Sequence, residues 1–362
     1  MMIKINRMAI SIAVWCVLSI SLSGGGGGPP PGGPPGGGPG RPPPPPGVVQ
    51  GEQLPPVDRS GPFFHQVKMA YSSDGLNWQY DDKVIFDHAS VPGALLKKDG
   101  TLLVYFVDGM RNDTSVGISR DLGQTWDIQP VNVKNLTAKS AVDPDPMELS
   151  TGAIRLYYLG WENTPTPSIA RNAPAQGPVQ VQKPAPESEE PPLHKVYSAI
   201  SRDGVNFVEE AGVRYAAPGI TDPDVIQTKK WWRMFLSVGQ DVLSAYSQDG
   251  LKWVADKGER GYFGAVTSTI QLPDGRLRMY ISARGIESMI SRDGLTWEFE
   301  DGVRISARPQ QVVADPSVVQ LQDGSYLMFY KTMNLPPPPE LPGPPRPPGA
   351  RRGNNPGPPP PK

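Results

Sequence analysis

The feature that most constrains this chain is a short motif that occurs five times. Each copy has serine, a variable residue and aspartate, then glycine and an aromatic residue a few positions later; the copies span 72–78, 119–126, 201–207, 247–253 and 291–297. Recurrence of one motif at such intervals is typical of repeat folds. Serine and aspartate side chains bond backbone amides in tight turns, glycine allows a positive φ, and the aromatic ring can pack between neighbouring sheets. We therefore interpret the motif as a structural turn between two strands and not as a catalytic group.

A second repeat alternates with the first. Each copy is an extended segment, a turn and an apolar strand rich in aromatic residues, with turns near residues 99–100, 151–152, 229–230, 274–275 and 323–324. The chain starts with one kind of hairpin and ends with the other, so we predict that residues 66–86 pair with 313–331. The predicted fold is all-β: a five-bladed β-propeller closed by pairing of the N-terminal strands with the C-terminal blade.

Three of the predicted inner strands begin with an aspartate followed by proline. The segments are Asp143-Pro144-Asp145, Asp222-Pro223-Asp224 and Asp315-Pro316. Inner strands of a propeller line a central funnel, and side chains two apart share a face of a strand, so these carboxylates should converge on one axis. Carboxylates gathered in this way raise one another's pKa, which can separate an acid from a base in glycoside hydrolysis. We predict that Asp143, Asp222 and Asp315 are catalytic; the alternative is that they anchor loops by accepting backbone amides.

These motifs resemble known families. The longest turn copy, Ser119 to Trp126, resembles the Asp-box, or BNR repeat, of sialidase-like β-propellers. The count of five blades and the Asp-Pro pairs resemble the five-bladed glycosidases of the arabinanase and invertase type, whereas sialidases proper have six blades. The resemblance implies a funnel with an aspartate base or nucleophile, an auxiliary aspartate and a glutamate acid from successive blades.

The sequence departs from that pattern in two blades. Their inner strands begin around Val91 and Val266, so neither supplies a carboxylate there, and no inner strand begins with the expected glutamate. Glu148 and Glu162 are candidate replacements without a motif of their own. Sialidase chemistry would need an arginine cluster to clamp a substrate carboxylate, together with a Tyr-Glu pair. Arg111, Arg284 and Tyr280 are available, but the sequence has no Arg-Ile-Pro segment, which a sialidase would be expected to have.

A ring of polar and aromatic residues is predicted where the second strand of each blade ends, on the same face as the aspartates. A sugar needs donors and acceptors for its hydroxyls and an aromatic wall for its C–H face. The predicted substrate-binding residues are Asp108, Arg111, Trp161, Glu162, Arg284 and Lys331, with Gln240 at the corresponding place in another blade. The alternative for each is ordinary solvation of the rim.

The ends of the chain differ in composition from its middle. Lys4 and Arg7 precede an apolar run over 8–22, which is typical of an export signal. Glycine and proline, 40 and 45 of the 362 residues, are concentrated near the two ends and cannot build a core there. We predict a signal peptide over 1–23, a disordered linker over 24–60, the propeller over 61–334 with a flexible insertion over 163–192, and a disordered proline-rich tail over 335–362. Cys16, inside the apolar run, leaves an N-terminal membrane or lipid anchor open.

The net charge of −1 gives no reason to expect nucleic-acid binding. The three histidines lack the spacing of a metal site, so we expect no metal and no cofactor. The sequence predicts a monomer that is secreted, periplasmic or on the cell surface, with carbohydrate as its partner and no membrane contact beyond the export signal. Two functions stay open: a glycoside hydrolase, either sialidase-superfamily-like or furanosidase-like, and a non-catalytic propeller that binds carbohydrate or protein on a flexible tether.

Overall fold

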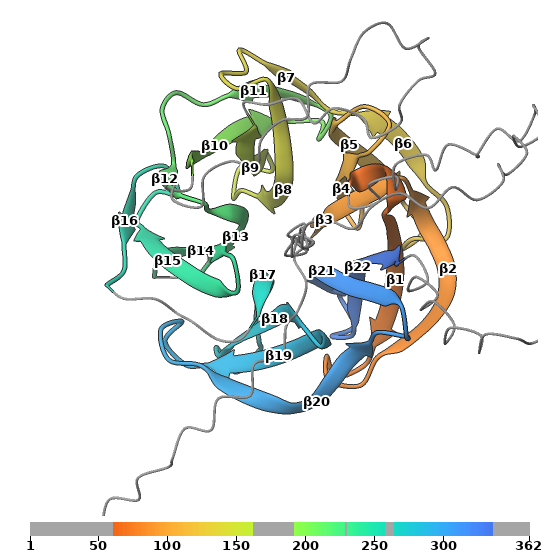
Figure 1. The fold of residues 1–362 in the computed structure, drawn as a ribbon. Helices are drawn as coiled ribbons and strands as arrows, with labels where there is room; N and C mark the ends of the chain where they lie inside the picture. Colours follow the sequence, from red (N-terminus) through yellow and green to blue (C-terminus); the bar gives the residue numbers. More distant parts are fainter. Residues whose placement is uncertain (1–60, 162–191, 229, 258–263, 336–362) are drawn as a thin grey trace, which may run out of the picture.

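The computed structural model describes residues 61–161, 192–228, 230–257 and 264–335, which are almost wholly β-structure. Five sheets surround a central axis (Figure 1), which confirms the predicted all-β, five-bladed propeller. The predicted signal peptide and linker, and nearly all of the predicted insertion and tail, lie outside the described residues. Their boundaries therefore stay predictions.

Each blade is described from its innermost strand, at the axis, to its outermost strand (Figure 1). Blade 1 contains β3 (Ala89–Leu96), β4 (Leu102–Asp108), β5 (Asp113–Ser119) and β6 (Asp127–Pro130). Blade 2 contains β8 (Ser140–Glu148), β9 (Ile154–Trp161), β10 (Leu193–Ser201) and β11 (Asn206–Glu209), with β7 (Asn132–Lys134) paired to β11 and β12 (Tyr215–Pro218) paired to β10. Blade 3 contains β13 (Thr221–Gln227), β14 (Trp232–Val238), β15 (Asp241–Ser247) and β16 (Trp253–Ala255). Blade 4 contains β17 (Ala265–Gln271), β18 (Leu277–Ala283), β19 (Gly285–Ser291) and β20 (Glu298–Ser306). Blade 5 contains β21 (Gln311–Gln320), β22 (Tyr326–Asn334), β1 (Gln66–Ser72) and β2 (Gln79–Asp87).

Blade 5 is built from both ends of the described chain. Strand β1 pairs antiparallel with β22, from Gln66 opposite Thr332 to Ser72 opposite Tyr326. A single 3-10 turn, η1 (Pro62–Phe64), precedes β1. In the described ranges, no helix is long and apolar enough to cross a membrane.

The hydrophobic core is divided into wedges between neighbouring blades. In every wedge, the aromatic residue of a repeated turn meets an aromatic residue on the second strand of the preceding blade, edge to face. The pairs are Trp78–Tyr280, Phe207–Tyr105, Trp126–Phe329, Trp253–Tyr157 and Trp297–Phe235, with ring centroids 5.7–6.1 Å apart. Such pairs contribute about 0.5–1.5 kcal/mol each beyond the burial of their surface. The expected packing of the motif between neighbouring sheets is therefore confirmed.

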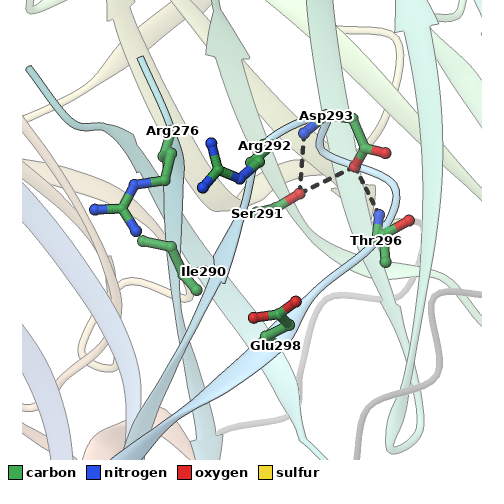
Figure 2. A pocket seen from close by; sticks show the side chains of 7 residues that line it. All are labelled: Arg276, Ile290, Ser291, Arg292, Asp293, Thr296 and Glu298. Atoms are coloured by element: carbon green, nitrogen blue, oxygen red, sulfur yellow. Dashed lines mark hydrogen bonds between the residues drawn. The ribbon is translucent and has the colours of Figure 1, made fainter. Parts of the chain in front are cut away.

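The serine and aspartate of each repeated turn bond the turn itself. Figure 2 shows this for the turn between β19 and β20. The Ser291 hydroxyl donates to Asp293 at 3.1 Å and accepts from the Asp293 amide, and the Asp293 carboxylate accepts the Thr296 amide at 2.7 Å. These turns lie at the end of the blades opposite to the beginnings of the inner strands, so their aspartates do not reach the site described below.

Every inner strand has a bulge near its beginning, where the pairing register shifts. One residue in each bulge has a φ of 46–51°, a left-handed conformation that is unusual for non-glycine residues: Val91, Asp143, Asp222, Val266 and Asp315. Because two valines adopt it, this backbone conformation belongs to the fold and does not depend on the aspartate side chain. The fold thus presents five equivalent side-chain positions at the axis, and three carry a carboxylate.

Candidate functional site

The five inner strands enclose a small cavity on the propeller axis. Its walls include the bulges of β3, β8, β13 and β17 and the first residues after the bulge of β21, with Asp143, Asp145, Asp222 and Asp224 among the lining residues. The cavity volume is about 30 Å³, which accommodates roughly one water molecule. Asp143 and Asp222, from neighbouring blades, therefore line one water-sized space, whereas Asp315 is not among its lining residues.

The side chain of Asp143 contacts the backbone of Asp222. The Asp143 carboxylate accepts a hydrogen bond from the Asp222 amide. Burial, reinforced by the Asp315 carboxylate, raises the pKa of Asp143 to about 6, although that amide and Lys331 act in the opposite direction. Burial, and then the charges of Asp143 and Asp315, raise the pKa of Asp222 well above its ordinary value. In both residues the protonated form of the carboxyl is therefore favoured, and Asp143 loses its proton near pH 6.

Asp315 lies behind this pair in an ion pair with Lys331. The Lys331 ammonium is 2.5 Å from Asp315 Oδ2, and Asp315 is only 2% exposed. Burial lowers the pKa of Lys331, but the carboxylates of Asp315, Asp222 and Asp143 outweigh it and raise that pKa above its ordinary value. Among the described residues, no group of three or more acidic, histidine or cysteine side chains is arranged to hold a metal ion. The positive charge at the axis is supplied by Lys331.

The mouth of the funnel is apolar on one side and polar on the other. On blades 1 and 2 the second-strand residues opposite the bulges are Val107 and Leu159, which pack together in one cluster with Trp161. On blades 3 and 4 the corresponding residues are Ser237 and Ser282, whose hydroxyls accept the amides of Val266 and Asp315 at 2.7 and 2.8 Å. On blade 5 the position is Lys331. The hydrogen-bonding groups are thus gathered on blades 3 to 5.

The second aspartate of each Asp-Pro-Asp segment has a different place from the first. Asp145 and Asp224 also line the cavity, and each bonds the inner strand of the next blade. Asp145 accepts the Val225 amide at 2.9 Å, and Asp224 accepts the hydroxyls of Thr267 and Thr269 at 2.7 Å each. These bonds to the next blade were not predicted from the sequence.

The predicted substrate-binding ring is only partly assembled around the carboxylates. Lys331 joins them, and Trp161 lies at the apolar side of the mouth, 5.7 Å from the His194 ring centroid. The Asp108 carboxylate instead accepts the Met110 amide and the Ser115 hydroxyl within its own blade. Neither predicted arginine lines the cavity: Arg111 is exposed, and Arg284 has a side chain that is 73% exposed and paired with Glu287 at 3.0 Å.

The two candidate glutamates do not complete the set. Glu162 lies outside the described residues. The suggestion that Glu148 replaces the missing acid is wrong, because Glu148 is at the far end of β8, opposite Ile154, and accepts the Lys98 amide at 2.9 Å. Glu148 is five positions beyond Asp143, which at about 3.3 Å per residue places it about 15 Å further along the strand. The exposed Gln240 is in the turn between β14 and β15, where its carbonyl accepts the Gly264 amide.

Comparisons with known proteins agree with the fold. No protein-family model and no curated protein matches the sequence. Among solved structures, a thermostable family-43 glycoside hydrolase is similar at 12% identity, with 68% of this chain and 88% of that chain covered and a TM-score of 0.51. An α-L-arabinofuranosidase from Lactobacillus brevis has 10% identity, 67% and 82% coverage and a TM-score of 0.48. A family-117 glycoside hydrolase from Zobellia galactanivorans has 11% identity, 75% and 91% coverage and a TM-score of 0.45. At such identities the likeness is one of fold: the chain is similar to the β-propellers of glycoside hydrolases.

Proposed function

We propose that the protein is a glycan-active propeller that hydrolyses glycosidic bonds at the axial carboxylates. The observation that carries the proposal is the Asp143–Asp222 pair, in which two contacting residues from different blades both have carboxyl groups with raised pKa values. Hydrolysis needs a carboxylic acid that protonates the leaving oxygen and a carboxylate that attacks the sugar or activates water. The family-43 glycoside hydrolase shares the fold, and the axial carboxylates are the groups that glycoside hydrolysis requires.

In this proposal Asp222 is the acid and Asp143 is the base or nucleophile. Burial and two neighbouring carboxylates raise the pKa of Asp222 well above its ordinary value and favour its protonated form, whereas Asp143 loses its proton near pH 6. Asp315 and Lys331 hold a fixed ion pair behind them, and Lys331 stabilises the charge of Asp143 once it is ionised. Trp161 offers an aromatic wall at the mouth for the C–H face of a sugar.

Turnover by the wild-type protein and by Asp143→Asn and Asp222→Asn tests the proposal. The substrates are a panel of aryl glycosides and oligosaccharides, and the control is Asp113→Asn, a half-buried aspartate outside the cavity. We expect each axial variant to lose at least roughly a hundredfold in kcat/KM, the scale of acid or base catalysis, while the control does not. Wild-type activity should rise through about pH 6 as Asp143 ionises. Equal activity of all four proteins would contradict the proposal.

A non-catalytic glycan-binding function is the second candidate. It is favoured by the small cavity, about 30 Å³, and by the use of the Asp143 carboxylate as an acceptor for a backbone amide. Failure of the wild-type protein to turn over any substrate, together with saturable binding on a glycan array that a Trp161→Ala variant loses, would support this candidate instead.

We also propose that the protein is exported, on the basis of the basic and apolar residues over 1–23. Export predicts that the protein is recovered outside the cytoplasm when its own N-terminus is present and inside when residues 1–23 are deleted. Recovery of both forms from the cytoplasm would contradict it.

A further inference from the structure

The inner strands have backbone amides that need hydrogen-bond acceptors from outside their own sheet. Each inner strand is the edge of its blade, so amides on its free side have no partner within the sheet. A buried backbone N–H without an acceptor is costly, so these groups need acceptors from elsewhere. Around the axis, the acceptor comes from the preceding blade.

Four side chains, all two residues after a bulge residue, form a directional series of links around the axis. Each accepts the amide of the residue three positions after the bulge residue in the next blade. The links are Asp145 to Val225 at 2.9 Å, Asp224 to Thr269 at 3.1 Å, Ser268 to Val318 at 3.0 Å and Ser317 to Ala94 at 2.8 Å.

The fifth position in the series, between blades 1 and 2, lacks both partners of such a link. The acceptor position is Gly93, which has no side chain, and the donor position is Pro146, which has no N–H. A Cβ atom added to Gly93 would lie 2.0 Å from the Pro144 carbonyl oxygen, so no larger residue fits there. The missing acceptor and the missing donor belong to the same link. This correspondence indicates that the series is a feature of the fold and not a set of chance contacts.

The link between blades 2 and 3 is the one that bears on the acid pair. Strand β8 holds β13 through two carboxylates: Asp143 accepts the Asp222 amide, and Asp145 accepts the Val225 amide three residues later. The held segment contains Pro223, so its backbone has little freedom between the two anchors. Asp145 therefore fixes the strand from which the Asp222 carboxyl projects.

We propose that Asp145 is a positioning residue, which by binding the Val225 amide holds the Asp222 carboxyl against Asp143. The inference rests on the proposed function in so far as that pair carries the chemistry. Titratable groups face the pair from three blades: Asp145 and Asp224 from β8 and β13, and Asp315 and Lys331 from β21 and β22. Strands β3 and β17 line the cavity with non-titratable residues, namely Val91, Pro92, Gly93, Val266, Thr267 and Ser268.

Burial and the charge of Asp224 raise the pKa of Asp145 well above its ordinary value, which favours the uncharged form of its carboxyl. Asparagine at this position keeps an acceptor oxygen for the Val225 amide, whereas alanine removes the acceptor. Val225→Pro removes the donor instead and leaves Asp145 intact, imitating the proline that already occupies the equivalent position in blade 2. Ser317→Ala breaks the same kind of link between blades 5 and 1 and leaves the link between Asp145 and Val225 intact.

The test is a titration of Asp143 in the full-length protein and these variants, followed by ¹³C NMR of labelled aspartate carboxyls, together with kcat and KM against pH. We expect Asp145→Ala and Val225→Pro to move the Asp143 midpoint by at least about half a pH unit and to lower kcat roughly tenfold with KM little changed. Asp145→Asn and Ser317→Ala should keep the Asp143 midpoint, because neither removes the acceptor of the Val225 amide.

An unchanged Asp143 midpoint in either Asp145→Ala or Val225→Pro would overturn the inference, as would an equal shift in Ser317→Ala, which would indicate general loosening of the ring. If the Asp145→Ala variant does not fold, the Asp143 midpoint in Val225→Pro decides whether the inference holds. Absence of turnover by the wild-type protein would sink the proposed function, whereas the NMR titration would still decide whether Asp145 positions the pair.

Discussion

At the outer turns, the Asp121 carboxylate accepts the amide and hydroxyl of Thr125 and stays open to water, whereas at the axis Asp143 lies among other carboxylates. The Thr125 hydroxyl, foremost among several donors, lowers the pKa of Asp121 to about 2, and burial raises that of Asp143 to about 6. The same residue type therefore titrates in opposite directions at the two ends of one blade architecture. Donors without burial stabilise the charged form, and burial with few donors destabilises it. This difference separates a structural aspartate from a candidate catalytic one.

The most disruptive change should be Lys331→Met, which removes the positive charge from the axis. The Asp315 carboxylate is then buried without a counter-charge, for which losses of about 3–5 kcal/mol in the free energy of unfolding are typical. The loss should shrink at pH 4, where Asp143 is protonated and less negative charge needs compensation. Urea unfolding at pH 8 and pH 4 measures both values. The same loss at the two pH values would show that the lysine acts by packing alone.

Asp143→Asn should stabilise the protein at high pH. The folded-state pKa of about 6 exceeds the unfolded value, so the folded state binds the proton more tightly and wild-type stability falls as the pH rises from about 4 to about 6. A shift of about two units corresponds to at most about 3 kcal/mol, which asparagine would recover at pH 8 but not at pH 4. The difference between the two proteins in urea, followed from pH 4 to pH 8, checks the prediction; a difference that does not change with pH would refute it.

Asp203→Ala at an outer turn should have the opposite sign. Asp203 accepts the amides of Val205 and Asn206, and hydrogen bonds, led by that of the Asn206 side chain, lower its pKa. Its contribution is therefore present above the unfolded pKa and is lost as the pH falls below it. We expect a loss of about 1–2 kcal/mol that is constant between pH 5 and pH 8. Thermal unfolding of both proteins from pH 5 to pH 8 measures the loss. A loss that varied with pH, as expected for Asp143→Asn, would contradict the prediction.

The smallest effect is expected for Tyr157→Phe, which removes one bond between a blade and the next outer turn. The Tyr157 hydroxyl donates to the Gly250 carbonyl at 2.8 Å, whereas Phe235 and Phe329 occupy the same place in two other wedges without a hydroxyl. Because the fold already tolerates phenylalanine there, we predict a cost of about 1 kcal/mol or less. A larger fall in the unfolding midpoint for Tyr157→Phe than for Asp203→Ala would reverse the expected order of the two effects.

The fold could be predicted from the sequence because each blade repeats a local pattern. A turn such as Ser119 to Trp126 specifies its own hydrogen bonds, and its aromatic residue specifies which neighbour it meets. The convergence of Asp143 and Asp222 followed from the same repetition. These predictions succeeded because they depend on periodicity and local chemistry.

The roles of the individual axial groups could not be predicted in the same way. The hydrogen bond between Asp145 and the Val225 amide depends on the bulge in the pairing of β8 with β9 and on the approach of β13. A signal was present: aligned by their bulges, the inner strands have small or acceptor residues at the same position, including Gly93 and Ser317. The burial of Asp315 behind Lys331 left no pattern in either segment, because it arises from packing across the axis.

The contrast between the axis and the outer turns is tested most directly by titrating the aspartate carboxyls of the wild-type protein by ¹³C NMR. We predict that Asp143 titrates near pH 6, that the Asp222 pKa is also raised well above its ordinary value, and that Asp121 titrates near pH 2. Midpoints near pH 4 for Asp143 and Asp222 would contradict this prediction, because the axis would then hold ordinary solvated carboxylates with no division between acid and base.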